Sequence, residues 1–135
     1  NTHYIKRLVG MGGETIRIGD DRHAYINDRR LEASDPGFDG VYSFGSKPPQ
    51  ASVFSGHVNG KVAREHGNMS IALQTEFPDG NASYKIRDNH YFVMGDNTMN
   101  SYDSRAWLDF PREKVIGKQF FVFWPITDRF GWHNK

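Results

Sequence analysis

The sequence predicts one mostly β domain, built of antiparallel β-sheets and interrupted by a loop-rich β insertion. Three observations favour this fold. Apolar residues recur in short runs with a period of two, turn-forming residues separate these runs, and no segment sustains a helical period. The 135 residues are enough for one domain. We expect its core over about residues 1–34 and 84–135, and the insertion over about residues 35–83.

The first predicted strand is Tyr4–Val9, which three glycines follow within the next four residues. Alternate side chains of a strand point to opposite faces of the sheet. The two faces then carry Tyr4, Lys6 and Leu8 on the side that we expect to be buried, and Ile5, Arg7 and Val9 on the other.

A second strand and a hairpin are predicted next. Glu14–Ile18 has the short alternating pattern of a strand. Ala24–Ile26 and Arg30–Glu32 flank Asn27-Asp28, and these two residue types tolerate the left-handed backbone of tight hairpin turns. The two segments are therefore predicted to pair as a hairpin.

The middle of the chain is rich in turn signals and weak in apolar pattern. Asp35-Pro36-Gly37, Lys47-Pro48-Pro49 and Pro78-Asp79-Gly80-Asn81 are typical of turns. Short strands are predicted near Val53–Val58 and Met69–Thr75.

The core pattern resumes near the C-terminus. Tyr91–Met94 and Val115–Trp124 read as strands, with Gly95 ending the first, and Pro111–Lys114 could form a turn of helix with proline at its first position. Aromatic residues make up 14% of the chain. This favours an aromatic-rich β core, with an apolar surface that touches lipid or substrate as the alternative. The residues concerned are Phe110, Phe120, Phe121, Phe123, Trp124, Phe130 and Trp132.

Composition excludes several classes of function. The 17 basic and 16 acidic residues nearly cancel, and no basic run alternates with aromatic residues, so no nucleic-acid partner is expected. There is no cysteine, which excludes disulfides and thiolate chemistry. No apolar run approaches the roughly 20 residues of a membrane helix, so the fragment itself is expected to be soluble.

Lys6 is the first candidate for chemistry. Desolvation on a buried strand face would disfavour its charged form, and a neutral amine is a competent general base toward a serine hydroxyl. The alternative is an edge-strand lysine that points to water and blocks aggregation.

The segment from Met94 to Trp107 is the second candidate, because short polar side chains crowd it. Such side chains can bond backbone groups and hold an irregular loop. Arg105 could lock the loop by a bidentate pair with Asp103 or with Asp96. The polar residues are Asp96, Asn97, Asn100, Ser101, Asp103, Ser104 and Arg105.

Together, the two segments resemble the C-terminal signature boxes of type I signal peptidases. The family's lysine box has the form Lys-Arg-x-x-Gly-x-Pro-Gly-Asp, and here Lys6 begins the matching stretch. The other box, Gly-Asp-Asn-x-x-x-Ser-x-Asp-Ser-Arg, matches from Gly95 to Arg105, and a Val-x-Gly strand follows at Val115. The resemblance covers both ends of the chain but not its middle.

The resemblance implies a catalytic domain of antiparallel sheets and a Ser–Lys dyad. Lys6 would be the general base and Ser101 the second serine, which orients the lysine amine. Supporting positions would be Arg7, Asp96, Asn97, Asp103, Ser104 and Arg105. No cofactor and no metal are expected, since the histidines at 3, 23, 57, 66, 90 and 133 show no ligand spacing.

Some positions depart from the family pattern. Gly12 replaces the usual proline, Glu14 the usual aspartate, Thr98-Met99 the common Arg-Asp, and Leu108-Asp109 follows Trp107 where glycine is common. The family's nucleophile lies upstream of the lysine in a Ser-Met-x-Pro stretch, which this sequence does not contain. We therefore expect a fragment that lacks the nucleophile and is inactive alone.

The implied function is that of a serine endopeptidase that removes signal peptides from secretory preproteins with small residues at the cleavage site. The implied setting is the outer face of the cytoplasmic membrane, with lipid contact in the full-length protein. Three alternatives stay open: a related Ser–Lys maturation peptidase, a non-catalytic signal-peptide-binding relative, and a β binding module that uses exposed tryptophans at 107, 124 or 132.

Overall fold

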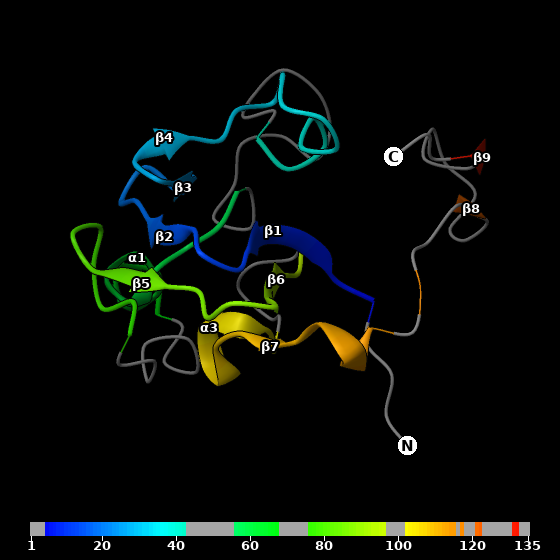
Figure 1. The fold of residues 1–135 in the computed structure, drawn as a ribbon. Coiled ribbons are helices and arrows are strands. Elements are labelled where there is room, and N and C mark those ends of the chain that lie inside the picture. Colours follow the sequence, from blue (N-terminus) through cyan, green and yellow to red (C-terminus); the bar gives the residue numbers. More distant parts are fainter. Residues whose placement is uncertain are drawn as a thin grey trace.

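The computed structural model describes residues 5–42, 56–67, 76–96, 102–115 and 117, and the backbone of residues 121–122 and 131–132. Its regular structure consists of two antiparallel sheets, a pair of two-residue strands and short helices (Figure 1). The mostly β fold predicted from the sequence is confirmed. Ser101, Asn97 and the strand predicted over residues 69–75 lie outside the described residues.

The first sheet has the strand order β1-β6-β7 and joins the two ends of the chain. β1 (Arg7–Met11) pairs antiparallel with β6 (His90–Met94), and β6 pairs with β7 (Phe110–Pro111). The register sets Arg7 opposite Met94. The start of β1 therefore lies beside the end of β6, although 87 positions separate Arg7 from Met94 in the chain (94 minus 7).

The second sheet has the order β4-β3-β2-β5. Its strands are β2 (Thr15–Ile18), β3 (Ala24–Ile26), β4 (Arg29–Arg30) and β5 (Ser83–Lys85). Asn27 and Asp28 between β3 and β4 have φ angles of 50° and 64°, as a type I′ hairpin turn requires. The predicted hairpin is thus confirmed, with its second strand over Arg29–Arg30 instead of Arg30–Glu32.

Two short helices were not predicted. α1 (Gly60–Glu65) begins after Asn59, whose side chain accepts the Val62 N–H, and α3 (Ser104–Trp107) begins after Asp103. Helices of six and four residues are too short to show a 3.6-residue period in the sequence. The predicted helical turn after Pro111 is present as the 3₁₀ helix η1 (Arg112–Lys114).

The C-terminal strands are shorter than predicted. β8 (Phe121–Val122) pairs antiparallel with β9 (Gly131–Trp132), and η1 and an exposed Val115 precede them. Val115 is therefore not part of a strand, and only Phe121–Val122 of the predicted Val115–Trp124 strand is seen among the described residues.

One buried cluster joins the two sheets and the middle of the chain. Ile16, Ile18 and Phe92 come from the sheets, and Phe77 packs edge-on against Phe92 with ring centroids 5.5 Å apart. The middle segment contributes four members of this cluster: Phe38, Val41, Tyr42 and Phe77. Residues of the predicted insertion thus pack into the same core as the two sheets.

Two sequence predictions about strands are wrong. The face of β1 expected to be buried carries Leu8 at 45% exposure, whereas Val9 on the other face is 8% exposed. The two faces carry almost equal apolar content, and a β-bulge between Leu8 and Gly10 breaks the alternation, so pattern could not choose between them. Gly56–Val58 is not a strand, because its residues are bonded singly to separate parts of the fold.

Candidate active site

Lys6 lies directly before β1 and is half-buried. Its neighbour Arg7 opens the strand opposite Met94, the last residue of β6. After β6 the chain continues through Gly95 and Asp96 toward Ser101, which follows Asp96 by five positions in the sequence. The register of one strand pair therefore brings both signature segments to the same end of the sheet (Figure 1).

Arg7 and Asp96 clamp this end of the sheet. Arg7 Nε lies 2.7 Å from Asp96 Oδ1, and Arg7 Nη2 lies 2.7 Å from Asp96 Oδ2, a bidentate pair. Arg7 Nη1 also donates to the Gly37 carbonyl, and the guanidinium lies 5.5 Å from the centroid of the Phe38 ring. The hydrogen bond to Asp96 raises the pKa of Arg7 above its ordinary value. Arg7 therefore joins the start of β1 to the residues after β6 and to the Gly37–Phe38 backbone.

Asp103 and Arg105 form a second pair, and both side chains are fully buried. Arg105 Nε donates to Asp103 Oδ1 at 2.9 Å, and Arg105 Nη2 donates to Asp103 Oδ2 at 2.7 Å. The same carboxylate accepts the Gly95 N–H at 2.9 Å and caps α3 through the Arg105 N–H. Of the two pairings open to Arg105 from the sequence, the structure contains the one with Asp103.

Ser104 joins α3 to β6. Its hydroxyl is buried and accepts the Val93 N–H at 2.9 Å. The three consecutive residues Asp103, Ser104 and Arg105 thus bond the backbone of β6, the residue after it and their own helix. These bonds tie the start of α3 to the end of β6.

The turn after β1 explains two departures from the family pattern. The Glu14 N–H donates to the Met11 carbonyl, and Gly13 has a φ of 88°, as at the third position of a type II turn. Glu14 Oε2 accepts the Met11 N–H at 2.7 Å and so closes the turn. A Cβ on Gly12 would meet the Arg87 carbonyl oxygen and the Asn89 nitrogen at 2.8 Å, which accounts for glycine at a position commonly occupied by proline.

The departure at Leu108-Asp109 affects the backbone, whereas Thr98-Met99 lies outside the described residues. Leu108 ends α3 with φ 61° and ψ −155°, a conformation that strongly favours glycine. Asp109, the next residue, is buried and accepts three hydrogen bonds from Arg87, one from its backbone and two from its guanidinium. This anchor holds the chain in place where the family commonly has glycine.

Sequence reasoning missed a buried aromatic cluster beside the two signature segments. The Tyr42 hydroxyl lies 2.7 Å from His57 Nδ1, and the Tyr42 ring stacks on His23 with centroids 4.5 Å apart. Burial, followed by the nearby Arg105 charge, lowers the pKa of His57 to about 3. Neither residue stands in a motif, so the sequence contains no signal that would have singled them out.

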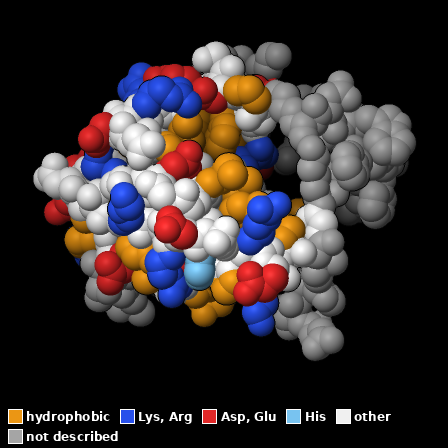
Figure 2. Space-filling view, viewed as in Figure 1, with side chains coloured by type: hydrophobic (Ala, Val, Ile, Leu, Met, Phe, Trp, Pro, Cys, Tyr) orange, Lys and Arg blue, Asp and Glu red, His pale blue; other side chains and the backbone are white. Residues whose placement is uncertain are grey.

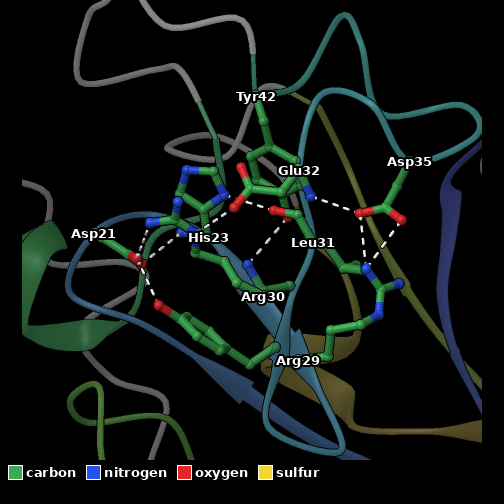
Figure 3. A network of polar contacts seen from close by, with 10 residues as sticks. Asp21, His23, Arg29, Arg30, Leu31, Glu32, Asp35 and Tyr42 are labelled. Carbon is green, nitrogen blue, oxygen red and sulfur yellow. Dashed lines mark hydrogen bonds and ion pairs between the residues drawn. The ribbon is translucent and has the colours of Figure 1, made fainter.

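Around Tyr42 and His23 the hairpin carries a polar network (Figure 3). His23 Nδ1 lies 2.6 Å from the Leu31 carbonyl oxygen, which fixes its ring beneath Tyr42. Ion pairs then continue to the surface: Arg30 with Asp21 and Glu32, and Arg29 with Asp35. These outer pairs are solvent-exposed and support the hairpin only weakly.

The surface of the described residues carries mixed charge (Figure 2). On the face shown, basic and acidic side chains are interspersed with hydrophobic ones. Within the described ranges no helix is long and apolar enough to cross a bilayer, and no three His, Asp or Glu side chains gather as metal ligands.

The fold and the site define the class of protein: a mostly β domain in which a lysine precedes an edge strand beside a loop supported by a buried Asp–Arg pair. The model of the family "signal peptidase, peptidase S26" matches residues 1–124. The chain belongs to this family.

Relatives agree with this assignment. Signal peptidase I of Bacillus amyloliquefaciens is 33% identical over 129 residues, which are 95% of this chain and 55% of that protein. Signal peptidase I of Pseudomonas fluorescens is 31% identical over 138 residues, with 93% and 45% covered. A solved signal peptidase I from Enterococcus faecalis V583 is similar with a TM-score of 0.49 and 22% identity, over 83% of this chain and 78% of that one. The chain spans about half the length of the curated relatives that it matches.

Proposed function

We propose that this chain carries the general-base half of a signal peptidase I, a serine endopeptidase that removes signal peptides from secretory preproteins. The observation that carries the proposal is the β1–β6 register, with Arg7 opposite Met94 and paired with Asp96. Because Lys6 precedes Arg7 and Ser101 follows Asp96 by five positions, both belong to segments that start from the same clamp.

The proposed chemistry is that of a Ser–Lys dyad. The deprotonated Lys6 amine takes the proton of the nucleophilic serine, which attacks the scissile carbonyl and forms an acyl-enzyme. Lys6 then takes a proton from the water that hydrolyses this ester. Ser101 is proposed to orient the amine, and the Arg7–Asp96 and Asp103–Arg105 pairs to hold both segments still.

The nucleophile is proposed to come from a part of the protein outside these 135 residues, because no Ser-Met-x-Pro stretch occurs within them. The 135-residue chain alone is then inactive. Cleavage of a preprotein by this chain alone, surviving Lys6→Ala, would refute both the assignment of Lys6 and the external nucleophile.

The substrate is proposed to bind as an added strand. β1 forms one edge of the described three-stranded sheet, and an extended peptide can pair with such an edge. Leu8 and Met11 in this strand and Ile5 just before it are exposed apolar side chains, suited to contact with a hydrophobic segment. Preproteins with small residues at the cleavage site, processed at the outer face of the cytoplasmic membrane, are the proposed substrates.

Lipid contact is proposed for the full-length protein, through the C-terminal aromatic residues Phe130 and Trp132. Flotation of the protein with anionic liposomes should weaken in a Phe130→Ser, Trp132→Ser variant. Equal flotation of the variant and the unaltered protein would remove this part of the proposal.

The central test is cleavage of a preprotein with an Ala-x-Ala site by the full-length protein. Lys6→Ala should lower kcat by on the order of 10³-fold or more, as loss of a dyad member does. Lys114→Ala, at an exposed lysine of η1, is the matched control and should leave kcat unchanged. Full activity of the Lys6→Ala variant would sink the proposal, as would an inactive unaltered protein that still binds signal peptide.

A further inference from the structure

Three consecutive residues outside any helix or strand, His57, Val58 and Asn59, are each 0% exposed. We call this segment the strap. Buried irregular backbone needs a partner for every polar group, and the strap finds its partners in separate parts of the fold. Its residues therefore join elements that are far apart in the sequence.

His57 is held by its backbone and by Tyr42. The His57 N–H donates to the Arg22 carbonyl at 2.8 Å, and His57 Nδ1 lies 2.7 Å from the Tyr42 hydroxyl. That hydroxyl also accepts the Ala24 N–H at 3.1 Å, so it links His57 to β3. His57 Nε2 has no hydrogen-bond partner among the described residues, so the ring is held by Tyr42 through Nδ1.

The ring of Tyr42 is fixed from three sides. It stacks on His23 at 4.5 Å and on Phe38 at 5.7 Å, and it meets the His57 ring edge-on at 5.5 Å. A ring packed in this way has one orientation, so its hydroxyl presents His57 with a hydrogen bond of fixed direction.

Val58 connects the strap to Arg105, the last residue of the signature segment Gly95–Arg105. Its carbonyl accepts a hydrogen bond from Arg105 Nη1 at 3.0 Å, on the side of the guanidinium that does not face Asp103. Asp103 in turn accepts the Gly95 N–H, at the end of β6. A shift of the Val58 carbonyl would therefore change the orientation of Arg105 and Asp103. Through Asp103 it would also move the Gly95 backbone.

Asn59 fixes the other end of the strap. Its side-chain amide donates to the Ile18 carbonyl at 2.9 Å and to Asp20 at 2.8 Å, and its oxygen caps α1 through the Val62 N–H. With Tyr42 on one side and β2 on the other, Val58 has little freedom to move.

We infer that Tyr42 and His57 are positioning residues for the proposed peptidase reaction, acting through the Val58 carbonyl on the Arg105–Asp103 pair and the Gly95 backbone. The inference rests on the proposed function. Tyr42 and His57 lie between the two signature segments in the chain, and the inference gives them a positioning role in the reaction.

Three variants of the full-length protein separate positioning from packing. His57→Leu fills the site but removes the hydrogen-bond partner of the Tyr42 hydroxyl at Nδ1, together with Nε2, which bonds nothing among the described residues. Tyr42→Phe removes the same bond from the other side. His57→Asn retains an acceptor at the position of Nδ1 and is the conservative rescue. Tyr25→Phe, which removes the bond between an outlying tyrosine and Asp21, is the matched control.

The steady-state kinetics and the hydrogen exchange of the Gly95 amide are both measured well below the Tm of each variant. The comparison is then between folded proteins. His57→Leu and Tyr42→Phe should lower kcat by about tenfold with KM unchanged within about twofold, because a displacement below 1 Å at a site costs up to about 10²-fold. His57→Asn and Tyr25→Phe should stay within about threefold of the unaltered kcat. Hydrogen exchange of the Gly95 amide should speed up in His57→Leu and Tyr42→Phe only.

The outcomes separate this inference from the proposed function. If His57→Leu lowers Tm but leaves both kcat and Gly95 exchange unchanged, the strap only stabilises the fold and the inference is overturned. An equal loss of kcat in His57→Asn and His57→Leu also overturns it. If the unaltered protein does not cleave preproteins, the proposed function fails, and unchanged Gly95 exchange in His57→Leu would then reject the coupling as well.

Discussion

Arg7 and Asp96 lie 89 positions apart in the chain and form a bidentate ion pair with both N–O distances at 2.7 Å. Each belongs to a signature segment: Arg7 follows Lys6, and Asp96 precedes Ser101 by five positions. The pair closes the sheet at the point where β1 begins and β6 ends. Its geometry makes it the first target for mutation.

A double-mutant cycle of Arg7→Gln and Asp96→Asn should give a coupling energy of about 1–2 kcal/mol, as charge-assisted, partly buried pairs do. Urea unfolding measures it. The Arg30–Glu32 pair, in which both side chains are more than 40% exposed, is the matched control and should couple by less than about 0.5 kcal/mol. Equal coupling in both pairs would contradict the assigned importance of the Arg7–Asp96 clamp.

Mutation of the Asp103–Arg105 pair should lower the free energy of unfolding far more than mutation of the Arg7–Asp96 pair, because both charges are fully buried. Arg105→Met leaves the Asp103 carboxylate buried without its cation, and we expect a loss of about 3–5 kcal/mol in the free energy of unfolding. Thermal and urea unfolding would reveal it. A loss under about 1 kcal/mol would mean that water reaches this carboxylate.

Gly12 should not tolerate a side chain. The Cβ of Gly12→Ala would lie 2.8 Å from the Arg87 carbonyl oxygen and from the Asn89 nitrogen, so the backbone of one segment must shift. We expect a loss of about 1–3 kcal/mol in stability. Gly40→Ala, where a Cβ meets nothing within 4 Å, is the control and should be neutral or slightly stabilising.

Stability should fall as the pH is lowered from about 7 to 5, because of His57. Its pKa is lowered to about 3 in the fold, against an ordinary value of 6.5, so the unfolded chain binds more protons in this range. The stability that neutral His57 contributes is complete above the unfolded pKa and is lost as the pH falls toward the folded pKa. The loss between pH 7 and 5 is about 2 kcal/mol for one such group.

Urea unfolding of the unaltered protein and of His57→Asn at both pH values isolates this contribution. The variant should show a pH dependence smaller by about 2 kcal/mol, since asparagine does not titrate. Parallel curves for the two proteins would show that His57 is not kept neutral by the fold.

Local sequence patterns predicted much of the fold. The hairpin at Asn27-Asp28, the strand ending at Met94 and the turn after Pro111 depend on residues close together in the chain, and each is present. The buried face of β1 could not be predicted, because Leu8 and Val9 are equally apolar and only the bulge and the packing decide between them. Helices α1 and α3 were missed because one or two turns leave no period to detect.

The sequence by itself determined the family, since the Lys6 segment and the Gly95–Arg105 segment have residue types and spacing that carry a specific resemblance. Tertiary structure decided which charges pair: Arg7 with Asp96, and Arg105 with Asp103 and Val58. It also brought His57 and Val58 next to Arg105. The physical reason is that a motif is a property of neighbours in the chain, whereas a buried charge or hydroxyl takes its partner from whichever backbone the fold packs against it.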